Sequence, residues 1–265
     1  MDAYTVKEIM TVAAARRLQN DSVCFVGIGL PSAAANLARL THAPEAVLIY
    51  ESGTIGATPT SLPLSIGDGE LAETAQSVVS TPEIFRYWLQ GGRVSTGFLG
   101  AAQIDRYANL NTTVIGPYGR PRTRLPGAGG APEIAANARE VLIIMEQSTR
   151  AFVQRLDFVT SVGYLRGGDE RVSLGLPGKG PVAVITDLCV MEPHVVRKEL
   201  VVTTLHPGVT PEQVRNATGW PVVFAEKLAE TGAPRDEELR ALRALVGRQP
   251  DHTPMSARPI LWRRA

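Results

Sequence analysis

The sequence has few of the residues that build covalent or metal-held frameworks. Its two cysteines, Cys24 and Cys189, both lie in apolar, strand-like runs. Two thiols without a paired spacing favour buried free cysteines over a disulfide framework or a thiolate metal site. The four histidines are scattered without ligand spacing, so we predict no metal site.

The chain also lacks an excess of either charge and lacks long apolar runs. Its 27 Lys and Arg residues nearly balance its 26 Asp and Glu residues, and the formal net charge of +1 argues against binding nucleic acid or a membrane surface. No apolar run approaches the roughly 18 residues of a membrane helix, and the N-terminus has no signal-peptide pattern. The 265 residues are 44% hydrophobic, enough for a sizeable core, and we expect a cytoplasmic, soluble α/β protein.

The first part of the chain predicts a strand–helix–strand unit. Residues 23–26 and 47–50 form buried apolar runs, and the alanine-rich segment 32–40 between them is helical in pattern. A crossover this short implies parallel strands joined right-handedly. The turns after parallel strands lie at one edge of the sheet, so we predict that turn 27–29 and turn 51–53 are neighbours.

Glu51 follows the second buried run directly. Open α/β sheets place their ligands at the carboxyl ends of strands. A carboxyl group with an ordinary pKa of about 4.3 is ionised near neutral pH, so it can act as a nucleophile without an adjacent base. The alternative interpretation is that Glu51 is only the first solvated residue of a loop.

A glycine-rich segment, 126–133, is the second strong feature. Gly127, Gly129 and Gly130 precede a helix predicted from about residue 132 to 138. Glycine lets the backbone approach a ligand closely, and free N–H groups at a helix start suit a negative charge. The segment is neither a Walker loop nor a dinucleotide fingerprint. A flexible turn is the alternative.

The remaining pattern predicts further elements. Capping signals at Thr5, Thr81 and Thr210 open helices, the second ending at Gly91. Residues 54–69 form a long irregular segment of the kind that often carries function, with a short strand near 62–66. Further strands are predicted at 94–99, 112–115, 141–145, 158–162, 182–188 and 200–205, with a turn around residues 193–194. A charged helix runs from about residue 237 to 246.

Several polar residues have two interpretations. Gln103 and Asn111 fit turns by default. Arg120, Arg122 and Arg124 alternate along an extended stretch, which fits either a solvated face or a contact to phosphate. Without repeats or a linker, one domain over 1–265 is the simplest division, with a poorly ordered tail from about residue 247. We predict an open, mostly parallel α/β sheet with helices on both faces.

In this order, the motifs resemble the second (B, or β) subunit of the family I coenzyme A transferases, in the glutaconate CoA-transferase-like branch. The resemblance runs from residue 6 to about 223 and is carried by segments that are specific only together: 27–31, 51–53, 91–92, 99–105, 109–111 and 127–131. The resemblance implies an open α/β fold of the NagB/RpiA-like superfamily. It also implies a separate A (α) subunit, which supplies a similar half and most of the CoA contacts and assembles with this chain as a heterodimer or as its dimer, an A2B2 heterotetramer.

The resemblance assigns the catalytic role to Glu51 and implies transfer of CoA from succinyl-CoA to a carboxylate such as 3-oxoadipate, through a glutamyl-CoA thioester. The CoA thioester is a substrate, and no permanently bound cofactor is expected. We take the N–H groups of Gly129 and Gly130 as candidates for holding the oxyanion. Candidate site-lining residues are Gly27, Gly29, Ser52, Gly53, Gln103 and Asn111.

Three alternatives stay open at this point. One is a hydrolase or ring-opening enzyme on the same scaffold; the resemblance implies that such relatives lack the glutamate, which favours transfer. Another is a different acceptor, such as glutaconate or another short dicarboxylate. The last is a non-enzymatic sensor or assembly partner, which has no reason to keep both Glu51 and the glycine loop.

Overall fold

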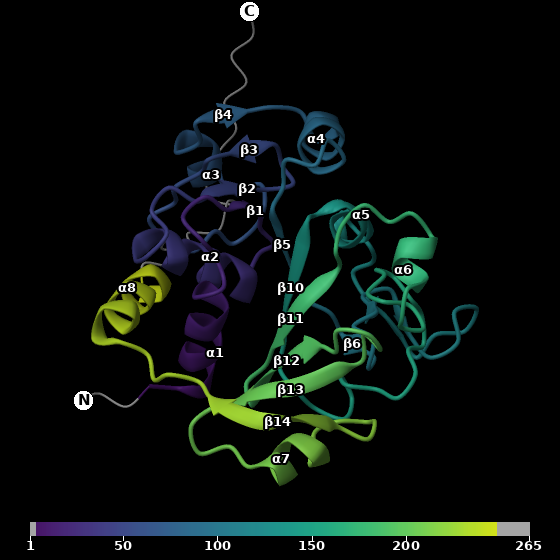
Figure 1. The fold of residues 1–265 in the computed structure, drawn as a ribbon. Helices are drawn as coiled ribbons and strands as arrows, with labels where there is room; N and C mark the ends of the chain where they lie inside the picture. Colours follow the sequence, from purple (N-terminus) through teal and green to yellow (C-terminus); the bar gives the residue numbers. More distant parts are fainter. Residues whose placement is uncertain (1–3, 248–265) are drawn as a thin grey trace, which may run out of the picture.

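A ten-stranded sheet crosses the molecule, as the computed structural model of residues 4–247 shows (Figure 1). Its strands are β1 (Val23–Phe25), β2 (Val47–Ile49), β3 (Thr54–Ile55), β4 (Ser77–Val78), β5 (Thr96–Leu99), β10 (Glu140–Ile144), β11 (Pro181–Ile185), β12 (Cys189–Pro193), β13 (Leu200–Leu205) and β14 (Val223–Glu230). The order is β14-β13-β12-β11-β10-β5-β1-β2-β3-β4.

The centre of this sheet is parallel. Strands β11, β10, β5, β1 and β2 pair in parallel, and β1 and β2 align Cys24 with Leu48. Antiparallel pairs flank the centre, with β12 and β13 on one side and β3 and β4 on the other. The predicted open, mostly parallel sheet is therefore confirmed, including the parallel crossover between β1 and β2.

Some strand predictions are wrong. Residues 62–66 and 158–162 form no strand, although Ser161 makes an isolated bridge with Leu110. The strand in the long segment is β3, two residues after Ser52. Residue Pro193, predicted within a turn, is the last residue of β12 and pairs with Leu200.

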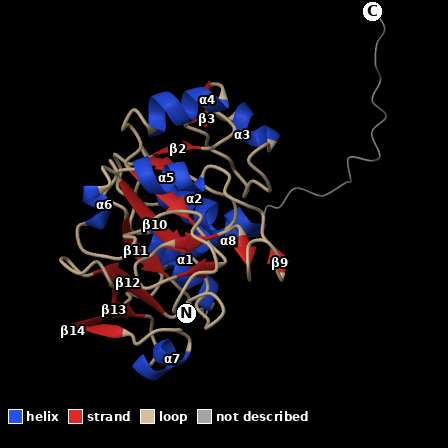
Figure 2. Ribbon diagram, turned by 90° about the vertical axis from the view of Figure 1, so that its right-hand side faces the viewer, coloured by secondary structure: helices blue, strands red, loops and turns tan. Residues whose placement is uncertain are grey.

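Helices cover both faces of the sheet (Figure 2). They are α1 (Val6–Ala15), α2 (Leu30–Leu40), α3 (Gly69–Glu73), α4 (Thr81–Glu83) with the π-helix η1 (Ile84–Leu89), α5 (Ala131–Asn137), α6 (Glu170–Ser173), α7 (Pro211–Asn216) and α8 (Asp236–Gly247). None of the helices in residues 4–247 is both long and apolar enough to cross a membrane. The predicted tail lies in residues 248–265, outside the described part of the chain.

Alternation along the central strands builds two cores. In β10, Leu142 and Ile144 pack in the core that contains α1, α2 and α8, whereas Val141 and Ile143 pack in the core that contains α5 and η1. Successive side chains of a strand point to opposite faces, so a sheet covered on both sides is apolar at every position. Cys24 and Cys189 are buried, as predicted.

The helices begin where the capping signals predict, except that the N-cap of α4 lies one residue earlier. Thr5 and Thr210 cap their helices as predicted. For α4 the N-cap is Ser80 rather than Thr81, because the Glu83 side chain completes the capping box with Ser80. The following left-handed residue is Gly92, with φ of 72°, rather than Gly91.

Two small sheets lie outside the large one. They pair β6 (Gln103–Ile104) with β7 (Leu110–Asn111) and β8 (Val114–Ile115) with β9 (Thr123–Arg124). The β8–β9 hairpin precedes the glycine-rich loop and α5 in the chain. The order of elements therefore connects the hairpin directly to one wall of the site described next.

Candidate active site

A cavity of about 340 Å³ lies where the carboxyl ends of the central strands meet the glycine-rich loop. Turn 27–28 follows β1, Glu51 follows β2, and Gly100 follows β5; all line this cavity together with residues 128–131. Parallel strands place these ends at one edge. The predicted proximity of the two turns is therefore confirmed.

Glu51 lies half-buried on the cavity wall. Its backbone carbonyl accepts a hydrogen bond from Thr81 Oγ1 at 3.3 Å. Its carboxylate forms no hydrogen bond or ion pair within residues 4–247, in contrast to Glu70, whose oxygens accept from Thr60 and Ser61. A carboxylate without a competing partner keeps its oxygen lone pairs available for a substrate.

Tyr50 fixes the strand end that carries Glu51. Its ring is fully buried, and its hydroxyl lies 3.2 Å from Ser32 Oγ and accepts from Asn36 Nδ2 at 3.1 Å. Burial raises the pKa of the Tyr50 hydroxyl, against the opposing effect of these hydrogen bonds, so the group stays neutral. Successive side chains alternate, so anchoring Tyr50 under α2 directs the next residue away from that core.

The glycine loop approaches the Glu51 carboxyl group closely. A methyl group on Gly130 would lie 3.3 Å from Glu51 Cδ and 2.5 Å from Phe85 Cζ, and one on Gly129 would lie 3.9 Å from Glu51 Oε2. Gly129 has φ of 49°, a region that favours glycine. The N–H groups of Gly129 and Gly130 donate no hydrogen bond to another described residue.

Two contacts, one with β5 and one with α6, hold α5 and with it Gly130 in place. A methyl group on Gly97 of β5 would lie 2.4 Å from Ile134 Cγ2, so the bare glycine lets the helix pack closely. At the other end, the buried Arg171 donates from Nη2 to the carbonyls of Ala135 at 2.6 Å and Ala136 at 3.2 Å. A cation at the C-terminal end of a helix stabilises its last carbonyl groups.

The structure separates other predicted site residues from this cavity. Gln103 and Asn111 are buried and bond each other, with Asn111 Nδ2 donating to Gln103 Oε1 at 2.7 Å, and Gln103 also donates to Asp157. Ser52 and Gly53 form the turn behind Glu51, where Gly53 has φ of 112°. The cavity lining, as far as residues 4–247 form it, includes none of these four predicted residues.

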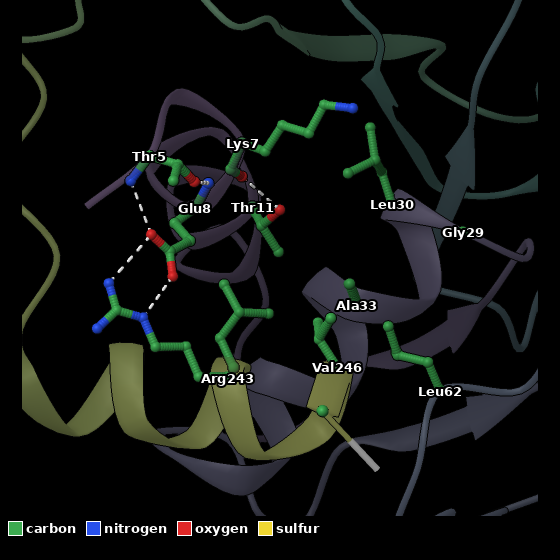
Figure 3. A pocket seen from close by; sticks show the side chains of 12 residues that line it. Thr5, Lys7, Glu8, Thr11, Gly29, Leu30, Ala33, Leu62, Arg243 and Val246 are labelled. Atoms are coloured by element: carbon green, nitrogen blue, oxygen red, sulfur yellow. Dashed lines mark hydrogen bonds and ion pairs between the residues drawn. The ribbon is translucent and has the colours of Figure 1, made fainter. Parts of the chain in front are cut away.

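Gly29 lines a different and larger cavity, of about 610 Å³, between α1, α2 and α8 (Figure 3). Glu8 also lines this larger cavity, and its carboxylate accepts hydrogen bonds from Arg243 Nε at 2.6 Å and from the backbone N–H of Thr5 at 2.7 Å. The hydrogen bond from Arg243 lowers the pKa of Glu8. Because both oxygens of the Glu8 carboxylate already accept hydrogen bonds from the protein, this carboxylate is less available to a substrate than that of Glu51. The smaller cavity is therefore the better candidate active site.

Sequence reasoning missed the apolar walls of the candidate site. They come from Ile28 and Pro31 beside the first turn, Phe98 on β5, and Ile66. Ile66 belongs to the long segment 54–69, whose length indicated a functional role without indicating which residue faces the site. Phe85 packs behind Gly130, but its position on the apolar face of its helix predicted only a core residue.

The fold and the cavity define an open α/β enzyme whose strand-end carboxylate faces a glycine loop. The coenzyme A transferase family model matches residues 7–217, and the chain belongs to that family. The predicted enzyme class, a CoA-transferase, is thereby confirmed.

Comparison with individual relatives and solved structures shows which members of this family the chain resembles. The chain is 69% identical, over 248 residues, to the B subunit of 3-oxoadipate CoA-transferase from Pseudomonas knackmussii, covering 94% of this chain and 95% of the relative. The crystal structure of glutaconate coenzyme A-transferase from Acidaminococcus fermentans matches with a TM-score of 0.85 and 33% identity, over 92% of this chain and 95% of that chain. The Rhodococcus jostii RHA1 IpdAB structure matches with a TM-score of 0.75 and 26% identity, over 92% and 94%.

Proposed function

We propose that this chain is the nucleophile-bearing B subunit of a CoA-transferase that moves CoA from succinyl-CoA to 3-oxoadipate. The observation that carries the proposal is the Glu51 carboxylate, which has no hydrogen-bond or ion-pair partner within residues 4–247 and lies beside Gly129 and Gly130 in one cavity. The 69% identity to a relative of this name, over nearly the full length of both chains, supports the choice of substrates.

In the first half-reaction, a Glu51 carboxylate oxygen attacks the thioester carbonyl carbon of succinyl-CoA. The C–S bond breaks, CoA leaves as a thiolate, and a mixed anhydride joins succinate to Glu51. The thiolate then attacks Glu51 Cδ and breaks the bond to succinate. Succinate leaves as a carboxylate, and Glu51 holds CoA as a thioester, so the energy of the thioester is retained.

In the second half-reaction, a carboxylate oxygen of 3-oxoadipate attacks Glu51 Cδ and displaces the CoA thiolate. The thiolate attacks the acyl carbon of the new anhydride, which forms 3-oxoadipyl-CoA and restores the Glu51 carboxylate. Every addition places negative charge on a carbonyl oxygen. The N–H groups of Gly129 and Gly130, which donate to no other described residue, are suited to hold this charge, and one such donor typically contributes about 10²–10³ in rate.

The proposal includes a second chain. The relatives are named as subunits, and the proposed assembly with an A subunit is an A2B2 heterotetramer. CoA takes part as a substrate, and no permanently bound cofactor is proposed. The cytoplasmic location stays a prediction.

A trapping experiment tests the role of Glu51. The chain is purified with its A subunit, incubated with succinyl-CoA without acceptor, and treated with borohydride, which reduces a glutamyl thioester. Mass spectrometry is expected to locate the reduced product at Glu51. Free CoA released at the full turnover rate, with no modified Glu51, would instead identify a hydrolase.

Substitutions complete the test. Glu51→Gln should abolish turnover, and Glu51→Asp should slow it severely because the carboxylate no longer reaches the thioester. Glu73→Gln, at an exposed carboxylate on α3, is the matched control and should keep wild-type activity. Normal activity of Glu51→Ala with any acceptor contradicts the proposal, and a panel of dicarboxylates, including glutaconate, identifies the acceptor.

A further inference from the structure

The β8–β9 hairpin carries an unbalanced positive charge. Arg120, Arg122 and Arg124 are all exposed, and residues 106–132 contain no Asp or Glu. Within residues 4–247, none of these three arginines forms an ion pair with a carboxylate. In a chain with a net charge of only +1, this is a local excess of cations, and it attracts an anion that residues 4–247 do not supply.

One guanidinium group of the hairpin is held in place. Arg124 Cζ lies 4.7 Å from the centre of the Tyr118 ring, and its Nη2 donates to the Tyr118 carbonyl at 3.2 Å. The Tyr118 ring in turn stacks on Phe158, with 5.4 Å between ring centres. A side chain that is already ordered loses less conformational entropy when it binds a ligand.

The hairpin is continuous with the glycine loop. Beyond β9, the N–H groups of Leu125 and Gly127 donate to the carbonyls of Thr113 and Thr112, which keeps the chain next to the other half of the hairpin. Arg124 lies five positions before Gly129, so their backbones lie at most about 18 Å apart. Figure 2 shows β9 at the edge of the molecule, away from the central strands.

This arrangement matches the shape of a CoA thioester. CoA carries its reactive group at one end of a long pantetheine arm and its phosphate groups at the other. A phosphate site must therefore lie at a distance from Glu51 but be fixed relative to it. The planar guanidinium group binds phosphate oxygens through paired hydrogen bonds, and three such groups alternate on one segment of the hairpin.

We propose that Arg120, Arg122 and Arg124 bind the phosphate groups at the nucleotide end of the CoA substrate. The inference rests on the proposed function, since it concerns the same acyl-CoA. It assigns to this chain a site for the remote part of the substrate, whose binding energy can be used at the reacting thioester.

The test compares two thioesters that differ only in the nucleotide. The variant Arg120→Gln/Arg122→Gln/Arg124→Gln, assembled with its A subunit, is assayed with succinyl-CoA and with succinyl-pantetheine. We expect kcat/KM to fall tenfold to a hundredfold for succinyl-CoA and to change less than twofold for succinyl-pantetheine. Raising the salt concentration should lower kcat/KM of the wild type for succinyl-CoA and have little effect on the variant.

Arg215→Gln is the matched control. Arg215 is also exposed and also lies 4.7 Å from the centre of an aromatic ring, that of Phe224, but it belongs to α7, which precedes the edge strand β14 of the large sheet. This variant should keep the wild-type kcat/KM for both thioesters. An equal loss for both thioesters in the triple variant, or loss of its assembly with the A subunit, would overturn the phosphate assignment.

Direct binding separates this inference from the proposed function. Adenosine 3′,5′-bisphosphate, which carries phosphate but no thioester, should bind the wild-type complex and bind the triple variant at least tenfold more weakly. Equal affinity overturns the inference even if Glu51 is the nucleophile. A loss of affinity supports it even if the trapping experiment finds no adduct on Glu51.

Discussion

One buried carboxylate, Glu238, joins the start of α8 to Arg16 at the end of α1. Its side chain is 2% exposed and accepts from Arg16 Nε at 2.9 Å and Nη2 at 2.7 Å, and from the backbone N–H of Arg235 at 2.7 Å. Burial opposes the ionisation of Glu238, but these hydrogen bonds outweigh it and lower its pKa from 4.5 to about 2. The charged form is therefore the one that holds α8.

The size of the effect follows from this pKa. Each pKa unit corresponds to about 1.4 kcal/mol, so ionised Glu238 stabilises the docked helix by about 3 kcal/mol at neutral pH. Because the pKa of the folded state is the lower one, this stabilisation is complete above the ordinary value of 4.5 and is lost as the pH falls toward 2. Between pH 7 and 5 it should stay constant.

Glu238→Gln removes the charge and keeps the shape. We expect the amides of α8 in the variant to exchange with deuterium about a hundredfold faster at pH 7, because the helix opens locally more often. Hydrogen exchange measured by mass spectrometry on the assembled complex gives this rate for α8 peptides. In the wild type, exchange corrected for its intrinsic pH dependence should accelerate only below pH 4.5.

Glu237→Gln is the control. Glu237 also pairs with Arg235, at 2.9 Å, but its side chain is 58% exposed, and an exposed ion pair contributes about 0–1 kcal/mol. In Glu237→Gln, the rate of deuterium exchange at the α8 amides should stay within a few-fold of the wild-type rate. Unchanged exchange in Glu238→Gln, or equal acceleration in both variants, would refute the assignment of this stabilisation to Glu238.

Two further substitutions test the positioning of the candidate site. Gly130→Ala should lower kcat by about 10²–10³ because the new methyl group displaces an oxyanion donor. Gly69→Ala on α3, whose added methyl group would lie more than 4 Å from every described residue except its chain neighbours and the backbone of its own helix, should leave steady-state rates unchanged. Arg171→Met removes the donor that the carbonyls of Ala135, Gly163 and Gly178 share, and each buried carbonyl left unpaired costs about 1–3 kcal/mol, so the thermal unfolding temperature should fall by several degrees. The exposed Arg139→Met should melt like the wild type, and equal melting of both variants contradicts the role of Arg171.

Local patterns predicted those parts of the fold that local interactions determine. The buried runs of β1 and β2, the helix between them and the capping box at Thr5 all depend on residues close in sequence. The short helical connection between β1 and β2 then requires the two strands to be parallel. Because they are parallel, the turns that follow them lie at the same edge of the sheet. For this reason the neighbourhood of Gly27 and Glu51 could be predicted before any distance was known.

Features that depend on distant partners could not be predicted in this way. Pro193 indicated a turn because proline is excluded from the interior of strands, yet it is accommodated at the end of β12. Gln103 looked like a turn or site residue because its partner Asp157 is 54 positions away. The approach of Gly130 to Phe85 likewise joins two segments with no periodic signal between them.

The geometry of the candidate site also bears on the choice between transfer and hydrolysis. An anhydride or thioester on Glu51 reacts with any water that reaches Glu51 Cδ, so transfer requires exclusion of water as well as a nucleophile. This chain supplies apolar walls from Ile28, Ile66 and Phe98, which offer water no hydrogen bonds. Glu51 is nevertheless half-buried and Gly129 exposed, so this chain alone leaves the carboxyl group accessible. The remaining wall has to come from the bound acyl-CoA or from a second subunit, and we therefore expect transfer without hydrolysis only in the assembled enzyme.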